Sequence, residues 1–242
     1  MFNPDVYDFR PIFDTIKKYY LIGIDKDFPN YAASPGFQEL VKLLEKNIHD
    51  DENYKARWEN FCIQVEKATS AKVISTTYCQ QPGFSAYLLI EETKMNNLTR
   101  SKELHFFIGL LGPYFSIIGK DSSSIEFEKD HYYTVTNYLT VSPDKEYTEI
   151  FKTVEAMIQD RFKDYWLIPF ELLKQKIGDG FFTPWNQDRE MTVFNALFNN
   201  QVETETKYIS GDQYYGREKW FRKDFDPSQL GGWTVYPRGE NF

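Results

Sequence analysis

The chain has 242 residues, of which 41% are hydrophobic, 26% are charged and only two are cysteines. A chain of this size buries about three quarters of its unfolded surface when it folds compactly, so it can form a substantial core. These numbers argue against an intrinsically disordered protein and against a small fold held together by disulfide bonds. The longest apolar runs, at 87–90 and 106–111, are far shorter than the ~20 residues that cross a bilayer.

The charge balance is acidic, with 36 Asp and Glu residues against 28 Lys and Arg residues and a net charge of -8. Because nucleic-acid affinity depends largely on Lys and Arg, this balance disfavours a nucleic-acid partner. It is consistent with charge that only keeps the protein soluble, and also with a partner that has a basic surface.

Aromatic residues make up 18% of the chain, and 17 residues are tyrosines. A buried phenol needs a hydrogen-bond partner, so a core alone does not account for so many tyrosines. Tyr and Trp also anchor many protein interfaces. Two explanations stay open, namely half-buried positions on a sheet and a binding face.

The N-terminal sequence MFNPDVYDFRPIF has acidic residues where a secretory signal peptide has basic ones, and no apolar segment follows it. We therefore expect a cytoplasmic protein without a membrane segment. The absence of internal repeats and low-complexity linkers favours one domain over residues 1–242. Its expected parts are a helical part (1–70), an antiparallel sheet (71–142), covering helices (143–200) and an aromatic C-terminal arm (201–242).

The first 70 residues have helical periodicity. Asp8 is placed to cap a first helix, and Ser34-Pro35 is a capping serine followed by a proline at the first helical position. Apolar residues then recur every three or four positions over 37–48 and over 54–65. Because the acidic segment 50–52 separates these two stripes, we expect two antiparallel helices with a short connection.

The periodicity changes from residue 72 onward, where β-branched and aromatic residues alternate with turn signals such as Asn96-Asn97, Gly112-Pro113 and Asp121-Ser122. The turns are too short for helical crossovers, so neighbouring strands should be antiparallel. The expected strands are 72–79, 84–93, 103–111, 114–119, 124–128 and 132–141.

The strongest helical stripe covers residues 144–166, and such a helix must cover a sheet or another helix. An irregular segment and a last helix near 188–199 follow it. The arm at 201–242 is too aromatic for a disordered tail and too rich in glycine for a helix, so we expect it to pack on the body. The predicted fold class is α+β, an antiparallel sheet of about five or six strands with an N-terminal helical pair and a long helix packed on it.

No motif in the sequence supports a particular chemistry. Glu103 and His105 should point to the same side of a strand, but zinc needs three or four ligands, so we expect a structural histidine and no metal site. Cys62 and Cys79 are isolated, and neither a nucleophile elbow nor a phosphate-binding loop occurs. We expect no cofactor and identify no catalytic residue.

One C-terminal stretch carries a resemblance. Residues 167–179, LIPFELLKQKIGD, followed by 191–198, MTVFNALF, resemble a closing segment of uncharacterised bacterial proteins. Some of these resemble immunity proteins that neutralise secreted polymorphic toxins. This resemblance covers about an eighth of the chain and implies a cognate protein toxin as the partner. The apolar residues of this stretch have a second explanation, because they would also pack the last helix.

We therefore expect a protein-binding function, that of an immunity or antitoxin-like inhibitor that neutralises a basic toxin domain. An enzyme (a hydrolase or transferase) with a site assembled from distant residues and a structural subunit are the alternatives. Acidic residues beside aromatic ones suggest two binding faces, one at the strand end near residue 91 and one on the arm. The candidate residues are Glu91, Glu92, Asp212, Tyr214, Tyr215, Glu218, Trp220, Asp224 and Asp226.

Overall fold

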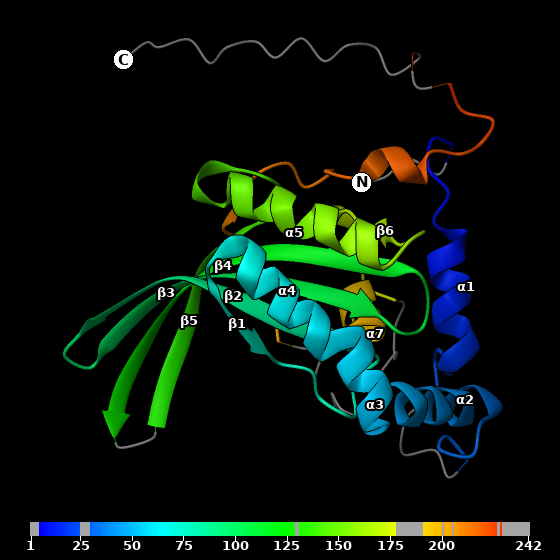
Figure 1. Ribbon diagram of the computed structural model, residues 1–242. Coiled ribbons are helices and arrows are strands. Elements are labelled where there is room, and N and C mark those ends of the chain that lie inside the picture. The colour runs from blue at the N-terminus through cyan, green and yellow to red at the C-terminus, as the bar shows by residue number, and fades with distance from the viewer. Residues whose placement is uncertain are drawn as a thin grey trace.

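The computed structural model describes residues 5–24, 30–128, 131–177, 191–199, 201–204, 206–226 and 228. Within these residues the chain has the expected α+β fold, in which helices flank a sheet of seven strands. Figure 1 shows the helices gathered at one end of the sheet, while the strands extend beyond them at the other end. Among the described residues, no helix combines the length and apolar character needed to cross a membrane.

The sheet is an antiparallel meander to which two short parallel strands are added. The order is β1-β2-β3-β4-β5-β7, and all neighbours from β1 to β5 are antiparallel, as predicted. The short strand β6 pairs in parallel with β4, and β7 pairs in parallel with β5. The strands are β1 (Lys72–Ser75), β2 (Gly83–Met95), β3 (Leu98–Gly109), β4 (Tyr114–Glu128), β5 (His131–Thr140), β6 (Trp166–Leu167) and β7 (Ile209–Ser210).

Strand β4 corrects one expectation. A turn was predicted at Asp121-Ser122, with separate strands on either side of it, but β4 continues through both residues as one strand of 15 residues. Asp121 pairs with Lys102 on β3, and a β-bulge at this level takes up one extra residue of β5. The Asn137 side chain donates to Asp121 Oδ1 over 2.6 Å. Partners on both neighbouring strands thus keep these turn-forming residues in the sheet.

The N-terminal helices follow one another with changes of direction. The start predicted at Ser34-Pro35 is confirmed, and the chain breaks at Asp50, whose backbone is extended. However, α2 packs mainly on α1, whereas α4 packs on α5 and β1, so the two stripes do not form an antiparallel pair. The elements are α1 (Arg10–Tyr19), α2 (Pro35–Leu44), the π-helical η1 (Glu45–His49), α3 (Asp51–Tyr54), the π-helical η2 (Lys55–Glu59) and α4 (Asn60–Thr69).

The predicted sheet-covering helix is confirmed over a shorter range. A 3-10 turn, η3 (Lys145–Tyr147), leads into α5 (Thr148–Arg161), which lies beside α4 on one face of the sheet (Figure 1). The side chain of Phe151 is fully buried in this layer. Tyr147 packs directly over Gly119 of β4, where an added Cβ would lie 2.8 Å from the tyrosine ring. This position therefore requires glycine.

The opposite face of the sheet has its own apolar layer. Phe107 of β3 packs edge to face with Phe194 of α7 (Val193–Leu197), with 5.0 Å between the ring centres. The short helix α6 (Phe170–Leu173) and α1 complete this layer. The sequence predicts a last helix near 188–199. Residues 188–190 lie outside the described residues, and the helix that is described, α7, begins at Val193 with Thr192 as its N-cap.

Candidate functional site

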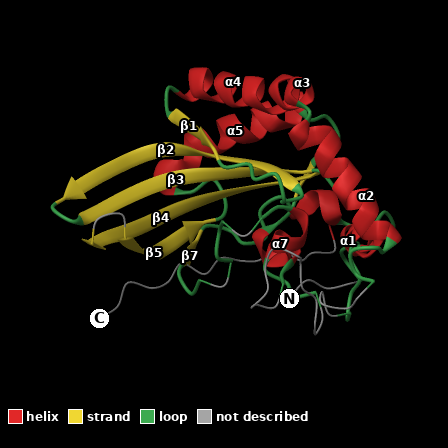
Figure 2. Ribbon diagram, turned by 90° about the horizontal axis from the view of Figure 1, so that it is seen from below, coloured by secondary structure: helices red, strands yellow, loops and turns green. Residues whose placement is uncertain are grey.

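The four long strands project beyond the helices that cover the rest of the sheet. We call this projection the distal blade, residues 91–102 and 121–137, of which 129 and 130 are not described. It consists of two hairpins, β2–β3 and β4–β5, and both figures show that neither α4 nor α5 extends over it (Figures 1 and 2). The strand register determines which side chains share each of its faces.

One face of the distal blade is apolar at its tip. Met95 pairs with Leu98, Leu98 pairs with Ile125 and Ile125 pairs with Tyr133, so one apolar row crosses all four strands. In the next row toward the body, Val135 pairs with Ser123. We call this side the distal face. The distal face belongs to the same side of the sheet as the face that α4 and α5 cover. Lys102 and Leu104 show this, because residues two positions apart on a strand point to the same side.

The large side chains of the distal face are exposed. Their exposed fractions are 49% for Met95, 44% for Ile125, 65% for Tyr133 and 44% for Val135. By contrast, Leu88 and Leu104, which lie on the same side of the sheet under the helices, are fully buried. The apolar side chains at the tip of this face therefore lie in a region where nothing among the described residues covers them.

The reverse side of the distal blade is polar. Directly behind the apolar row lies a row of Lys94, Thr99, Ser124 and Thr134. The Ser124 and Thr134 hydroxyls are 2.6 Å apart, and those of Ser101 and Ser122, in the next row, are 3.0 Å apart. At the tip the strands of the blade thus have an apolar row on one side and a hydroxyl-rich row on the other.

A charged row separates the apolar tip from the covered part of the sheet. Lys102 Nζ lies 3.5 Å from Glu91 Oε2 and donates to Glu146 Oε1 over 2.8 Å. The hydrogen bond to Glu146 raises the pKa of Lys102, and the same bond lowers the pKa of Glu146. Glu146 belongs to η3, so this ion pair joins the base of the blade to the start of the covering helix.

A shallow hollow of about 310 Å³ lies on the distal face between the apolar tip and this charged row. It contains both carboxylates and cations, so it can accept a partner side chain of either charge. Its lining residues are Glu91, Thr93, Met95, Arg100, Ser101, Lys102, Asp121 and Asn137.

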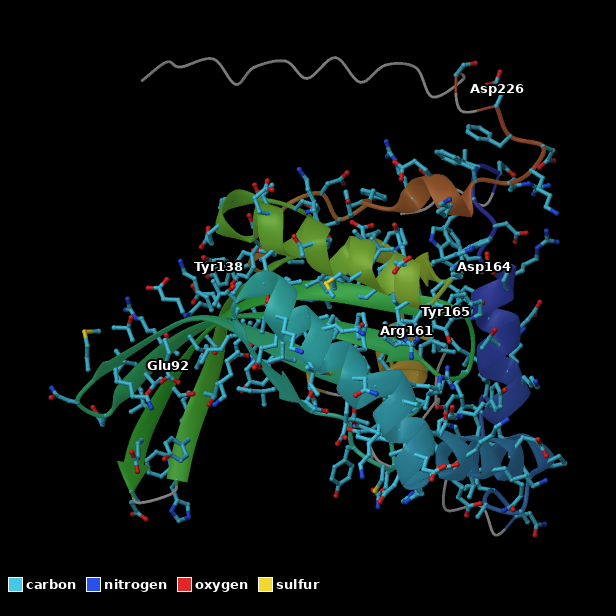
Figure 3. All side chains as sticks on the ribbon, in the orientation of Figure 1. Glu92, Tyr138, Arg161, Asp164, Tyr165 and Asp226 are labelled. Carbon is cyan, nitrogen blue, oxygen red and sulfur yellow. The ribbon has the colours of Figure 1, made fainter. Side chains whose placement is uncertain are left out.

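The two strand-end candidates from the sequence lie on opposite sides of the blade. Glu91 lines the hollow of the distal face, whereas Glu92 pairs with Ser101 on the reverse side and forms an ion pair of 3.1 Å with Lys94. Figure 3 places Glu92 on the blade and Asp226 beyond the other end of the body. The strand-end candidates and the arm candidates therefore do not form one site.

The described part of the arm packs on the body, and its largest aromatic side chains point inward. Trp220 is 1% exposed and donates from Nε1 to the Leu167 carbonyl over 2.8 Å. This differs from the surface position expected for Trp220, because its indole fills the space between Trp166 and Tyr114, with ring centres 5.3 and 6.0 Å away. Tyr215 is half-buried and donates to Glu155 over 2.8 Å.

The remaining arm candidates are mostly exposed. Asp212 accepts a hydrogen bond from the Tyr214 backbone, which shapes a turn. Asp224 forms a pair of hydrogen bonds with Arg222 over 3.0 and 3.1 Å, and this pairing lowers the pKa of Asp224. Glu218 and Asp226 are also exposed. Asp224 lines a hollow of about 510 Å³ together with Trp166 and Phe221, and the cations Arg10, Lys219, Arg222 and Lys223 also line it.

The predicted structural histidine lies on the covered part of the sheet. His105 Nε2 is 2.7 Å from Glu103 Oε2, and its ring stacks on Tyr87 with 5.1 Å between the ring centres. Burial lowers the pKa of His105. Burial also opposes ionisation of Glu103, but the His105 hydrogen bond and the nearby charges outweigh it, so the pKa of Glu103 lies below its usual value. In the described part of the chain, no three His, Cys, Asp or Glu side chains gather as metal ligands would.

The apolar row of the distal face is not among the binding faces predicted from the sequence. One signal for it is the alternation within 121–137, which the turn expected at Asp121-Ser122 interrupts. The other half of the row, Met95 and Leu98, flanks Asn96-Asn97 and lies outside the expected strands 84–93 and 103–111. The comparisons with known proteins add no residue to the site, because no family model, curated protein or solved structure matches this chain.

Proposed function

We propose that this chain is a protein-binding protein and that the distal face is the surface on which its partner docks. The observation that carries this proposal is the apolar row of Met95, Leu98, Ile125 and Tyr133 on a face that no described element covers. Contiguous exposed apolar side chains with a polar rim are typical of protein–protein interaction sites.

The reverse side of the same strands supports this interpretation. Ser and Thr side chains occupy it, and their hydroxyls lie within hydrogen-bond distance across the strands. Antiparallel sheets with one solvated face commonly have polar residues there. The reverse side thus has the composition of a solvated face, whereas the tip of the distal face exposes apolar side chains that a partner would bury.

We further propose that the partner is a protein with a basic surface, in keeping with an immunity or antitoxin-like inhibitor. The support for this finer proposal is the net charge of -8, which would attract a basic partner over distance and speed encounter. Tyr133 would supply an aromatic anchor at the tip, and Glu91 and Asp121 would lie at the rim of the contact. Association with such a partner should weaken as the salt concentration rises.

A matched pair of substitutions on β4 tests the docking surface. Ile125→Lys places a charge in the apolar row, whereas Ser124→Lys places the same charge on the reverse side one residue away. The partner is sought by affinity purification with the proteins encoded beside the gene, and its binding is then measured by calorimetry. A change in melting temperature of less than about 2 °C would show that both variants are folded.

The expected result is a loss of affinity of at least tenfold for Ile125→Lys and little change for Ser124→Lys, because a charge buried in an interface core is costly. Equal affinities of the two variants would show that the partner binds elsewhere, with the arm as the next surface to test. Turnover of a small-molecule substrate by the purified chain alone would contradict the binding function itself.

A further inference from the structure

The outer edge of strand β5 is open along the distal blade. On one side β5 pairs with β4 over its whole length, but on the other side β7 pairs with it only at Leu139 and Thr140. No strand among the described residues pairs with the outer edge of residues 132–137. An open edge offers backbone donors and acceptors to another strand.

The two outer edges of the blade differ in how they are protected. β1 pairs with β2 only as far as Leu89, so the outer edge of residues 90–95 is unpaired by β1. This segment includes Glu91, Glu92 and Lys94. Charged residues on an edge strand normally prevent edge-to-edge pairing. On β5, the ten residues from His131 to Thr140 contain no Asp, Glu, Lys, Arg or Pro. The outer edge of β2 therefore carries charged residues that oppose pairing with another strand, and the outer edge of β5 does not. We call the β2 edge the guarded edge.

This uncharged strand is complementary to itself. If two copies pair antiparallel about a two-fold axis at Thr134, Tyr133 of one copy lies opposite Val135 of the other, and Thr134 lies opposite Thr134. Paired residues point to the same side of a sheet, so Tyr133 and Val135 of both copies would share one face, and Tyr132, Thr134 and Thr136 the other. The distal faces of the two copies would then join into one surface.

We infer that β5 pairs with β5 of a second copy of this chain, which makes the protein a two-fold symmetric dimer through its distal blade. Two chains with a net charge of -8 repel each other, and a contact through residues 131–140 adds no further like-charge repulsion, because this strand contains no Asp, Glu, Lys or Arg. The paired segment, residues 132–136, is short, so the interface belongs to the small class that forms weak and concentration-dependent complexes.

The first experiment measures mass by sedimentation equilibrium over a range of protein concentrations. The mass should rise from the 28.7 kDa of one chain toward twice that value as the concentration increases. Association should strengthen between low and high salt, because salt screens the repulsion between two acidic chains. This salt dependence is opposite to the one expected for a basic partner, so the dimer and the proposed partner binding can fail or succeed separately.

Two lysine substitutions then locate the interface. Thr134→Lys brings two like charges opposite each other at the two-fold axis and should weaken the dimer at least tenfold. Thr93→Lys adds the same charge to the guarded edge on β2 and should leave the dimer unchanged. Melting temperatures within about 2 °C of the parent would show that both variants are folded.

A cross-link tests the pairing itself. Cys79 is exposed and is first replaced by serine, while Cys62 is buried. In this background Thr134→Cys should form a disulfide between two copies under mild oxidation, because directly paired Cα atoms lie about 4.5–5.5 Å apart, within the range that a disulfide spans. Glu92→Cys, on the other edge of the blade, should not. A monomeric mass at every concentration, or a dimer that resists Thr134→Lys and cross-links through position 92, would overturn the inference.

Discussion

Lys102 donates from Nζ to Glu146 Oε1 over 2.8 Å, which joins the base of the distal blade to the 3-10 turn in front of the covering helix α5. The two residues are 44 positions apart in the chain, and Lys102 also approaches Glu91 on β2. This ion pair marks the boundary at which the sheet passes from a face covered by helices to one that is open.

The Lys102–Glu146 pair should contribute a small but measurable stability. Because about a third of each side chain is exposed, Glu146→Gln should lower the free energy of unfolding by only ~0.2–1 kcal/mol. The lowered pKa of Glu146 means that its contribution is present above the usual pKa of 4.5 and is lost as the pH falls. Urea denaturation at pH 7 checks the value, with Glu149→Gln in the exposed first turn of α5 as the control. No difference between the two variants would show that the pair is fully screened by solvent.

The covering helix should depend strongly on Phe151. This side chain is fully buried and meets the ring of Tyr215 edge to face, with 5.7 Å between the ring centres. Phe151→Ala removes that packing and should lower the free energy of unfolding by ~3–5 kcal/mol. Lys152→Ala, one residue along on the exposed side, should change it by less than about 0.5 kcal/mol. A loss below about 1 kcal/mol for Phe151→Ala, measured by chemical denaturation, would contradict the layer described above.

The arm should be part of the folded body up to at least Trp220. The indole is buried against Trp166, Tyr114 and Phe9, and its Nε1 is bonded to the Leu167 carbonyl. Trp220→Ala should therefore lower the free energy of unfolding by ~3–5 kcal/mol. The neighbouring exposed Lys219→Ala should be nearly neutral.

A chain that ends at residue 205 tests the same point, because it lacks residues 206–242 of the arm. Its melting temperature should fall well below that of the full chain. If it instead remained as stable as the full chain while losing a partner, the arm would be an interface, as the clusters of aromatic and acidic residues in the sequence suggested.

Local patterns predicted most of the architecture but not the distal face. The alternation of residues and the turns at Asn96-Asn97 and Gly112-Pro113 predict that neighbouring strands from β1 to β5 pair in chain order. The run Asp121-Ser122-Ser123-Ser124 is typical of a turn, and only pairing with β3 and β5 keeps it in a strand. A turn there would end the sheet near the covering helices, and the expected strands 84–93 and 103–111 also leave residues 94–102 outside the sheet. These errors together concealed the blade.

The arm illustrates a second limit. Its composition indicates that the aromatic residues are ordered, but it does not indicate which of them point inward. Trp220 is buried because residues from three distant segments, Phe9, Tyr114 and Trp166, surround it, and such contacts depend on the assembled fold. Asp224, four residues later, is exposed. The candidate residues of the arm therefore include both buried and exposed side chains.

The buried histidine should make the protein less stable in mild acid. Burial lowers the pKa of His105 below its usual 6.5, so the unfolded chain binds a proton there more readily than the folded one. Its contribution to stability is therefore present above pH 6.5 and is lost as the pH falls toward the folded pKa. Glu103 acts in the same direction at lower pH because its pKa is also lowered, and the nearby Lys120 further disfavours protonation of His105.

His105→Gln isolates this effect, because the glutamine amide can still donate to Glu103 but does not titrate. The melting temperature of the parent chain should fall between pH 7 and pH 5, and that of His105→Gln should fall clearly less over the same interval. The measurement is a thermal melt at both pH values for each chain, with His131→Gln, which changes an exposed histidine at the tip of the blade, as the control. The control should behave like the parent chain. If the parent and His105→Gln lost equal melting temperature, then the proton uptake that destabilises the protein in acid would have to occur at other groups.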